Sequence, residues 1–378
     1  MPWKEATPME QRKAFLEAYQ QSNCSFTSLC KAFGISRKTG YKLLQRAKEE
    51  GCIDIQDRSR KPHHSPNQTS QELVDVVIEL RRKHPVWGAK KIHRLMEDKG
   101  YQTIPSISTI NAILKRNGMI DPEKAKKHKA FIRFEHKHPN DLWQIDFKGP
   151  IPIIGAKDCH PLTVLDDHSR FLLGLRACLD ESVATVQAQM SSIFEEHGLP
   201  KRMLMDNGSA WKTDDYSRHT GFTVWLMGLG IQITHGRPYH PQTQGKEERL
   251  HRTLQEELLN RRVFNSMLEI QSDFDQWRET YNYIRPHEAL DMDVPASRYK
   301  KSDRSFPEYE VVYSYPADFT LCKINGDGRL RFQGANLRIG KPFANCIVGM
   351  EQTETKGVYN VNYCGSIIRR VELNEGKC

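Results

Sequence analysis

The spacing of apolar residues predicts helices in the first part of the chain. In residues 7–50 apolar positions recur at helical intervals, and a turn at 33–35 separates the last two predicted helices. Ser36 precedes the last of them and is placed to cap it. A short helix, a turn with Gly and a helix with a basic start are typical of a helix-turn-helix domain, here residues 1–50. An ordinary helical hairpin with a solvated basic face is the alternative.

A second helical pattern covers residues 69–119. Its predicted helices end near Pro85, Gly100 and Gly118, and Ser106 is a predicted N-cap of the third. This segment also resembles a helix-turn-helix domain.

Residues 138–302 alternate between strand and helix patterns. Strands are predicted in "DLWQIDFKGP" and, as a pair, in "HPLTVLDDHSRFLLGLRACL". Helix 181–198 and a short strand before "DNG" follow, then a helix, a strand and two longer helices. This order indicates a mixed α/β sheet with helices on its faces. The aromatic residues Phe274, Trp277 and Tyr281 have helical spacing, and we expect them to pack on this sheet rather than on a second copy of the chain.

Residues 303–378 have short strand patterns broken by Gly and Asn, such as "EYEVVY", "LRFQGANLRI" and "VYNVNYCGSIIRRVEL". They predict a small β domain, similar to a barrel.

Charge is concentrated at the start of the chain. The sequence holds 56 Lys and Arg against 47 Asp and Glu, a formal net charge of +9. Residues 1–137 account for 27 of these basic and 15 of these acidic residues, so the rest of the chain is slightly acidic. Residues 51–68 and 120–137 read as basic linkers. A polyanion such as double-stranded DNA is therefore the expected partner.

An acidic membrane is a weaker alternative, because no long apolar segment and no basic helix with a bulky apolar face is present. The N-terminus has no apolar signal core, which predicts a cytoplasmic protein. Nine cysteines without a C-x-x-C pair fit a reducing compartment, and a zinc site with His63 and His64 is not favoured.

Residues expected to contact DNA are polar or basic and lie in the predicted helix starts and the first linker. They are Arg37, Lys38, Thr39, Lys42, Arg58, Arg60, Lys61, Ser108, Thr109, Asn111, Lys115 and Arg252.

Carboxylates at three positions predict a catalytic site. Asp146 lies inside a strand that reads as buried, and Asp206 follows a strand at the turn "DNG". Glu247 and Glu248 lie where the loop "HPQTQG" meets a basic helix. The glutamates and Asp206 have ordinary alternatives, because acids favour helix starts and Asp favours turns.

The order of these segments resembles the catalytic core of retroviral integrases and of the insertion-sequence transposases of the DDE group, which have an RNase H-like fold. The matching pieces are "WQIDF", "MDNGSAW", "RPYHPQTQGKEERLHRTL" and "YNYIRPHEAL". The resemblance implies that Asp146, Asp206 and Glu248 bind metal. Glu248 is three residues after Gly245, as the pattern requires, and Glu247 points about 100° away on a helix. Asp214 and Asp215 fall in a surface insertion, and Asp166 and Asp167 read as a hairpin turn.

Three carboxylates suit two Mg²⁺ ions, or Mn²⁺ as a substitute, placed about 3.5–4 Å apart for phosphodiester transfer. The resemblance therefore implies a bacterial, nucleoid-associated transposase that binds terminal inverted repeats, cuts DNA and joins it to a target. It implies a homo-oligomer and no small-molecule cofactor. A structure-specific nuclease that does not join ends, and an inactive DNA-binding regulator, are the alternatives.

Overall fold

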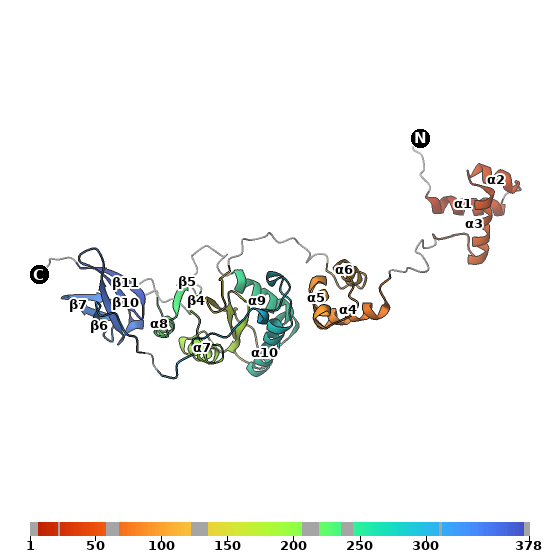
Figure 1. The fold of residues 1–378 in the computed structure, drawn as a ribbon. Helices are drawn as coiled ribbons and strands as arrows, with labels where there is room; N and C mark the ends of the chain where they lie inside the picture. The colour runs from red at the N-terminus through yellow and green to blue at the C-terminus, as the bar shows by residue number, and fades with distance from the viewer. Residues whose placement is uncertain are drawn as a thin grey trace. The chain divides into compact units, whose positions relative to one another are not determined.

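The computed structural model describes residues 7–21, 23–57, 68–121, 135–205, 219–235, 245–309 and 312–373 (Figure 1). The chain divides into two compact units, Met1–Gln68 and Thr69–Cys378, and each is considered by itself below.

The first unit is a three-helix domain, as the sequence predicts. Its helices are α1 (Pro8–Gln21), α2 (Phe26–Ala32) and α3 (Arg37–Glu50). Ser36 caps α3, because its side chain accepts a hydrogen bond from the backbone N–H of Thr39. Gly40 lets α3 approach the other helices, since a Cβ atom there would lie 2.8 Å from both Cys30 and Phe26. The helix-turn-helix interpretation of this segment is thus confirmed.

The second unit begins with another set of three helices. They are α4 (Gln71–Lys83), α5 (Ala89–Asp98) and α6 (Ile107–Arg116). Ser106 caps α6 as predicted, and Gly100 and Gly118 have the positive φ values that end helices. Their apolar faces meet in one cluster around Trp87, which is 1% exposed.

A mixed five-stranded sheet forms the centre of the second unit, with the strand order β3-β2-β1-β4-β5. The first three strands are antiparallel, whereas β1, β4 and β5 run parallel. This is the mixed sheet that the RNase H-like interpretation predicts. The strands are β1 (Trp143–Phe147), β2 (His160–Asp166), β3 (Leu172–Cys178), β4 (Arg202–Met205) and β5 (Gln232–His235).

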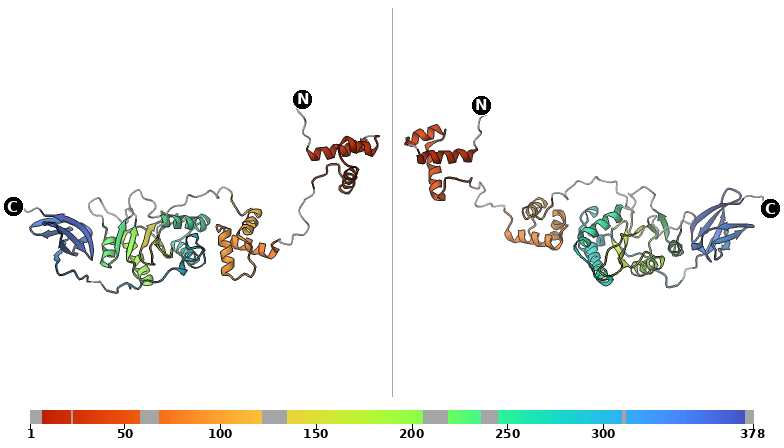
Figure 2. Two further views of the ribbon diagram at one scale, coloured as in Figure 1. Left: turned by 45° about the horizontal axis from the view of Figure 1, so that its top comes forward. Right: turned by 180° about the vertical axis from the view of Figure 1, so that it is seen from behind.

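Helices cover both faces of this sheet (Figures 1 and 2). One face packs on α7 (Val183–His197) and α8 (Gly221–Gly228), and the other on α9 (Gly245–Glu257) and α10 (Met267–Tyr283). The apolar cluster that α9 and α10 share with the sheet buries Phe274, Trp277 and Tyr281 of α10. These aromatic residues therefore pack within their own subunit, as expected. None of the helices in the described ranges is long and apolar enough to cross a membrane.

The carboxylate of Glu257, at the end of α9, joins three segments. It accepts hydrogen bonds from Nε1 of Trp87 (3.1 Å) and from Nε1 of Trp277 (3.2 Å). Nε of Arg285 lies 2.9 Å from the same group. The side chains of Glu257 and Arg285 are only 10% and 11% exposed, so this cluster attaches α9 both to α10 and to the preceding helical domain.

The C-terminal residues form two antiparallel sheets around one apolar cluster. Two hairpins have two-residue turns, Gln333-Gly334 in one and Cys364-Gly365 in the other. Both pairs have the positive φ values of type I′ turns. In the expected strand "EYEVVY", the described residues 308, 309, 312 and 313 are not in a strand. The strands are β6 (Thr320–Lys323), β7 (Arg329–Phe332), β8 (Ala335–Arg338), β9 (Ile347–Gln352), β10 (Val358–Tyr363) and β11 (Ser366–Glu372).

Candidate functional site

Asp146 lies near the carboxyl end of the central strand β1. Side chains alternate along a strand, so Trp143 and Ile145 enter the core with α7, whereas Gln144 and Asp146 face α9. The Asp146 side chain is 24% exposed. Strand β4 runs parallel to β1 and ends at Met205. The next residue in the sequence is Asp206, the second predicted acid, which lies outside the described residues.

The two glutamates at the start of α9 have opposite environments. The Glu248 side chain is 74% exposed, and its Oε1 lies 3.9 Å from Nη2 of Arg252 one turn later. Glu247 is 1% exposed and shares the inner face of α9 with Leu250 and Leu254. Glu248 is therefore the member of the pair that is accessible to solvent and to a bound substrate.

Asp146 is close to α9 through Glu247 and His251. Nδ1 of His251 lies 3.9 Å from Oδ2 of Asp146, and Nε2 lies 3.8 Å from Oε2 of Glu247. Burial, and then the charge of Asp146, raise the pKa of Glu247 well above its usual value, while a hydrogen bond from Thr163 acts in the opposite direction. Burial lowers the pKa of His251 to about 4, with a smaller contribution from Lys148. The ring of His251 is thus neutral at pH 7.

Asp166 ends β2 and Asp167 begins the expected turn to β3, but both are buried. Asp166 accepts hydrogen bonds from the backbone N–H groups of Asn140 and Ser169. Asp167 pairs with the ammonium group of Lys246, which anchors the first turn of α9 to this turn. Burial lowers the pKa of Lys246 to about 8. The sequence pattern gave no indication of this anchor, because its partners are 79 residues apart.

The oxygen donors at this edge of the sheet fit Mg²⁺. Asp146 is half-buried and Glu248 is accessible, and carboxylate oxygens are the protein ligands that Mg²⁺ prefers. His251, the adjacent imidazole, is already hydrogen-bonded to Thr163. Within the described ranges no group of three His, Cys, Asp or Glu residues is close enough to hold a metal ion.

The predicted DNA contacts of the first unit lie on one exposed helix start. Arg37, Lys38, Thr39 and Lys42 are all exposed on α3. Arg58, Arg60 and Lys61, the linker residues, lie outside the described part of the chain.

The predicted contacts in the second helical set differ from one another. Ser108, Asn111 and Lys115 are exposed on α6. The hydroxyl of Thr109 instead lies 3.0 Å from that of Ser106, as part of the helix cap. Ser108 and Asn111 also line a pocket of about 340 Å³ next to the start of α5.

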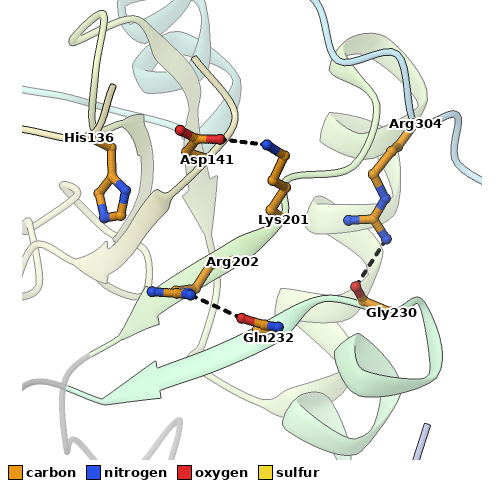
Figure 3. Close-up of a pocket in the computed structure, with 7 residues that line it drawn as sticks. All are labelled: His136, Asp141, Lys201, Arg202, Gly230, Gln232 and Arg304. Carbon is orange, nitrogen blue, oxygen red and sulfur yellow. Dashed lines mark hydrogen bonds and ion pairs between the residues drawn. The ribbon is translucent and has the colours of Figure 1, made fainter. Parts of the chain in front are cut away.

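A larger hollow of about 500 Å³ lies at the amino ends of β4 and β5 (Figure 3). Nζ of Lys201 lies 2.8 Å from Asp141, and Arg202 donates a hydrogen bond to Gln232. Because Arg202 begins β4 and Asp206 follows its other end, this hollow is at the opposite end of the strand from the predicted acid. We therefore do not assign the candidate site to it.

Four segments of the chain match known protein families. Residues 136–241 and 229–295 each match a family described as integrase core domain. Residues 11–63 match a helix-turn-helix domain, and residues 39–114 match a homeodomain-like domain.

The chain is also similar to proteins of bacterial insertion elements. An uncharacterized 39.2 kDa protein of insertion element IS476 from Xanthomonas euvesicatoria is 25% identical over 237 residues, which cover 61% of this chain and 65% of that protein. This chain thus spans slightly less than two thirds of that relative. The transposase for insertion sequence IS1202 from Streptococcus pneumoniae is 22% identical over 275 residues, which cover 60% of this chain and 57% of that protein.

Among solved structures, a simian T-cell lymphotropic virus intasome aligns with a TM-score of 0.38 and 16% identity, covering 75% of this chain and 91% of that chain. The HTLV-2 integrase catalytic core in complex with magnesium aligns with a TM-score of 0.33 and 15% identity, covering 43% of this chain and 97% of that chain.

Proposed function

We propose that this chain binds the ends of a mobile DNA element and cuts and joins DNA strands there. The proposal starts from its family, because the chain belongs to the insertion-element transposases that carry an integrase core. The observation that carries this proposal is the position of Asp146. A carboxylate on the central strand faces α9, whose exposed Glu248 lies at the same helix start that Lys246 anchors to the sheet.

We assign Asp146, Asp206 and Glu248 as the metal-binding carboxylates. Two Mg²⁺ ions, or Mn²⁺, would supply the charge that activates an attacking oxygen and stabilises a leaving oxygen. Arg252 lies on the same exposed face as Glu248, where it can hold a DNA phosphate. Water would first attack one strand to release a 3′-OH, and this hydroxyl would then attack the target strand. Neither step needs a covalent bond between the protein and DNA.

We assign sequence-specific DNA binding to residues 1–50 and 69–119. The exposed residues on α3 and α6 are polar or basic, which suits contacts to phosphates and base edges.

Strand cleavage tests the proposed function directly. Purified protein is incubated with end-labelled element DNA and Mg²⁺, and the products are resolved by length. We expect nicks at the element ends followed by products joined to target DNA. Nicked products without joined ones would instead support the nuclease alternative, and binding without either product would support the regulator.

A fragment of residues 1–137 should bind element ends with a steep salt dependence. Its excess of basic residues must displace counterions from about six phosphates, so affinity should fall roughly a thousand-fold between about 50 and 200 mM salt. Arg37, Lys38 and Lys42 are then replaced together by Ala. The slope of log affinity against log salt concentration should decrease by the amount expected for about three lost phosphate contacts. Fluorescence anisotropy measures both. Equal affinity for element ends and random DNA would contradict this assignment.

The active complex should contain at least two protomers. Joining two element ends to one target requires two active sites, and each chain carries one set of predicted acids. Light scattering of the protein with paired-end DNA measures the number of protomers per complex. A fully active complex with one protomer would show that this expectation is wrong.

A further inference from the structure

Thr163 joins the strand of Asp146 to helix α9. It lies directly opposite Asp146 in the pairing of β1 and β2. Its hydroxyl lies 3.0 Å from the carbonyl oxygen of Asp146, 3.2 Å from Oε2 of Glu247 and 2.9 Å from Nε2 of His251. One hydroxyl therefore contacts β1 and two successive turns of α9. We refer to Thr163, Glu247 and His251 as the inner polar cluster.

His251 extends this cluster to the carboxylate of Asp146. Because Nε2 is hydrogen-bonded to Thr163, the orientation of the ring is fixed, and Nδ1 is the nitrogen that faces Asp146. The distance of 3.9 Å from Nδ1 to Oδ2 is slightly longer than a hydrogen bond. In the tautomer that carries its proton on Nδ1, Nε2 accepts a hydrogen bond from the Thr163 hydroxyl, and a small rotation of either side chain would allow Nδ1 to donate to the carboxylate.

Packing alone does not explain these polar groups. Thr163 is fully buried and Glu247 is 1% exposed, and Leu250 and Leu254 fill the following positions on the inner face of α9. Among the residues that the structure describes, Oε1 of Glu247 has no hydrogen-bond partner. A buried polar atom without a partner destabilises a fold, so an apolar residue at position 247 would serve the core better.

We propose that the inner polar cluster positions the carboxylate of Asp146 against α9, and that it thereby sets the affinity of the site for its divalent cation. Thr163 fixes His251, and His251 restricts the rotation of Asp146. Hydrogen-bond partners of metal-binding side chains commonly contribute ten- to hundred-fold to metal affinity. This inference rests on the proposed function, because it takes Asp146 to be a metal-binding residue.

The test removes the Thr163 hydroxyl from the full-length protein while keeping the shape of its side chain. Mn²⁺ binding is measured by calorimetry without DNA, and the Mg²⁺ concentration for half-maximal nicking is measured separately. We expect Thr163→Val to raise the Mn²⁺ dissociation constant and the Mg²⁺ midpoint by about ten- to hundred-fold. Thr163→Ser keeps the hydroxyl, so both quantities should stay within about three-fold of the native values.

Thr223→Val provides a matched control. Thr223 is also a buried threonine, and its hydroxyl hydrogen-bonds to Thr220 in the cap of α8, away from Asp146. The change should lower the melting temperature and leave both metal midpoints unchanged. Equal metal midpoints for Thr163→Val and Thr223→Val would overturn the inference.

His251→Leu carries the same test if Thr163→Val does not fold, and we expect the same rise in both midpoints. Native metal midpoints in a folded His251→Leu protein would overturn the inference. If the native protein binds Mn²⁺ but does not nick element ends, the proposed function fails. The Mn²⁺ affinities of the variants would then still decide the role of the inner polar cluster.

Discussion

Asp146→Asn is expected to lower the rates of strand cleavage and joining at least about a thousand-fold, while binding to element ends stays within about two-fold. Asparagine keeps the shape of the side chain but removes the negative charge that would hold a divalent cation on β1. Glu248→Gln and Asp206→Asn should have the same effect, since each removes one proposed metal-binding charge. Gel assays of nicked and joined products measure the rates, and a filter-binding assay measures the affinity for DNA.

Glu247→Gln is the matched control for Glu248→Gln. The two residues are adjacent, yet Glu247 is buried and Glu248 is exposed. The amide N–H of glutamine can donate a hydrogen bond to the Thr163 oxygen and keep this contact, so we expect Glu247→Gln to retain most of the cleavage activity. An active Glu248→Gln protein together with an inactive Glu247→Gln protein would move the proposed metal-binding role from Glu248 to Glu247.

Glu257→Ala should strongly destabilise the second unit. It leaves the buried guanidinium of Arg285 without its ion-pair partner and removes the acceptor of two indole N–H groups, those of Trp87 and Trp277. Removing one partner of a buried ion pair costs about 3–5 kcal/mol. Thermal unfolding followed by circular dichroism should show a melting temperature roughly 10 °C lower for the second unit.

Glu256→Ala is the control for Glu257→Ala, because it removes a negative charge at the same helix end without breaking the Glu257 contacts. Glu256 is exposed, and removing an exposed side chain changes the free energy of unfolding by less than about 0.5 kcal/mol. If Glu256→Ala and Glu257→Ala lower the melting temperature equally, the Glu257 cluster does not contribute as we infer.

The local elements of the fold could be predicted because their causes are local. Ser36 and Ser106 cap helices through backbone N–H groups three residues away, and hydrophobic spacing located α9 and α10. The mixed sheet also followed from alternating strand and helix patterns. Such signals need only a short window of sequence.

The non-local parts of the site could not be predicted from the pattern. Asp167 read as a polar residue of a hairpin turn, but its carboxylate is buried and contacts Lys246 and Gln144 from distant parts of the chain. The contacts of Thr163 are equally distant, since Glu247 is 84 residues away. The described residues of "EYEVVY" form no strand, and β-propensity alone does not form one.

The long sequence separation within the site also determines when it can form during protein synthesis. Asp146 emerges from the ribosome before Lys246, which anchors the start of α9 to Asp167, and before Glu257, which attaches its end. At roughly 5–20 residues per second, the ribosome needs about ten seconds to proceed from Asp146 to Glu257. The helical domains at the start of the chain can therefore fold several seconds before the same chain holds all three proposed metal-binding acids.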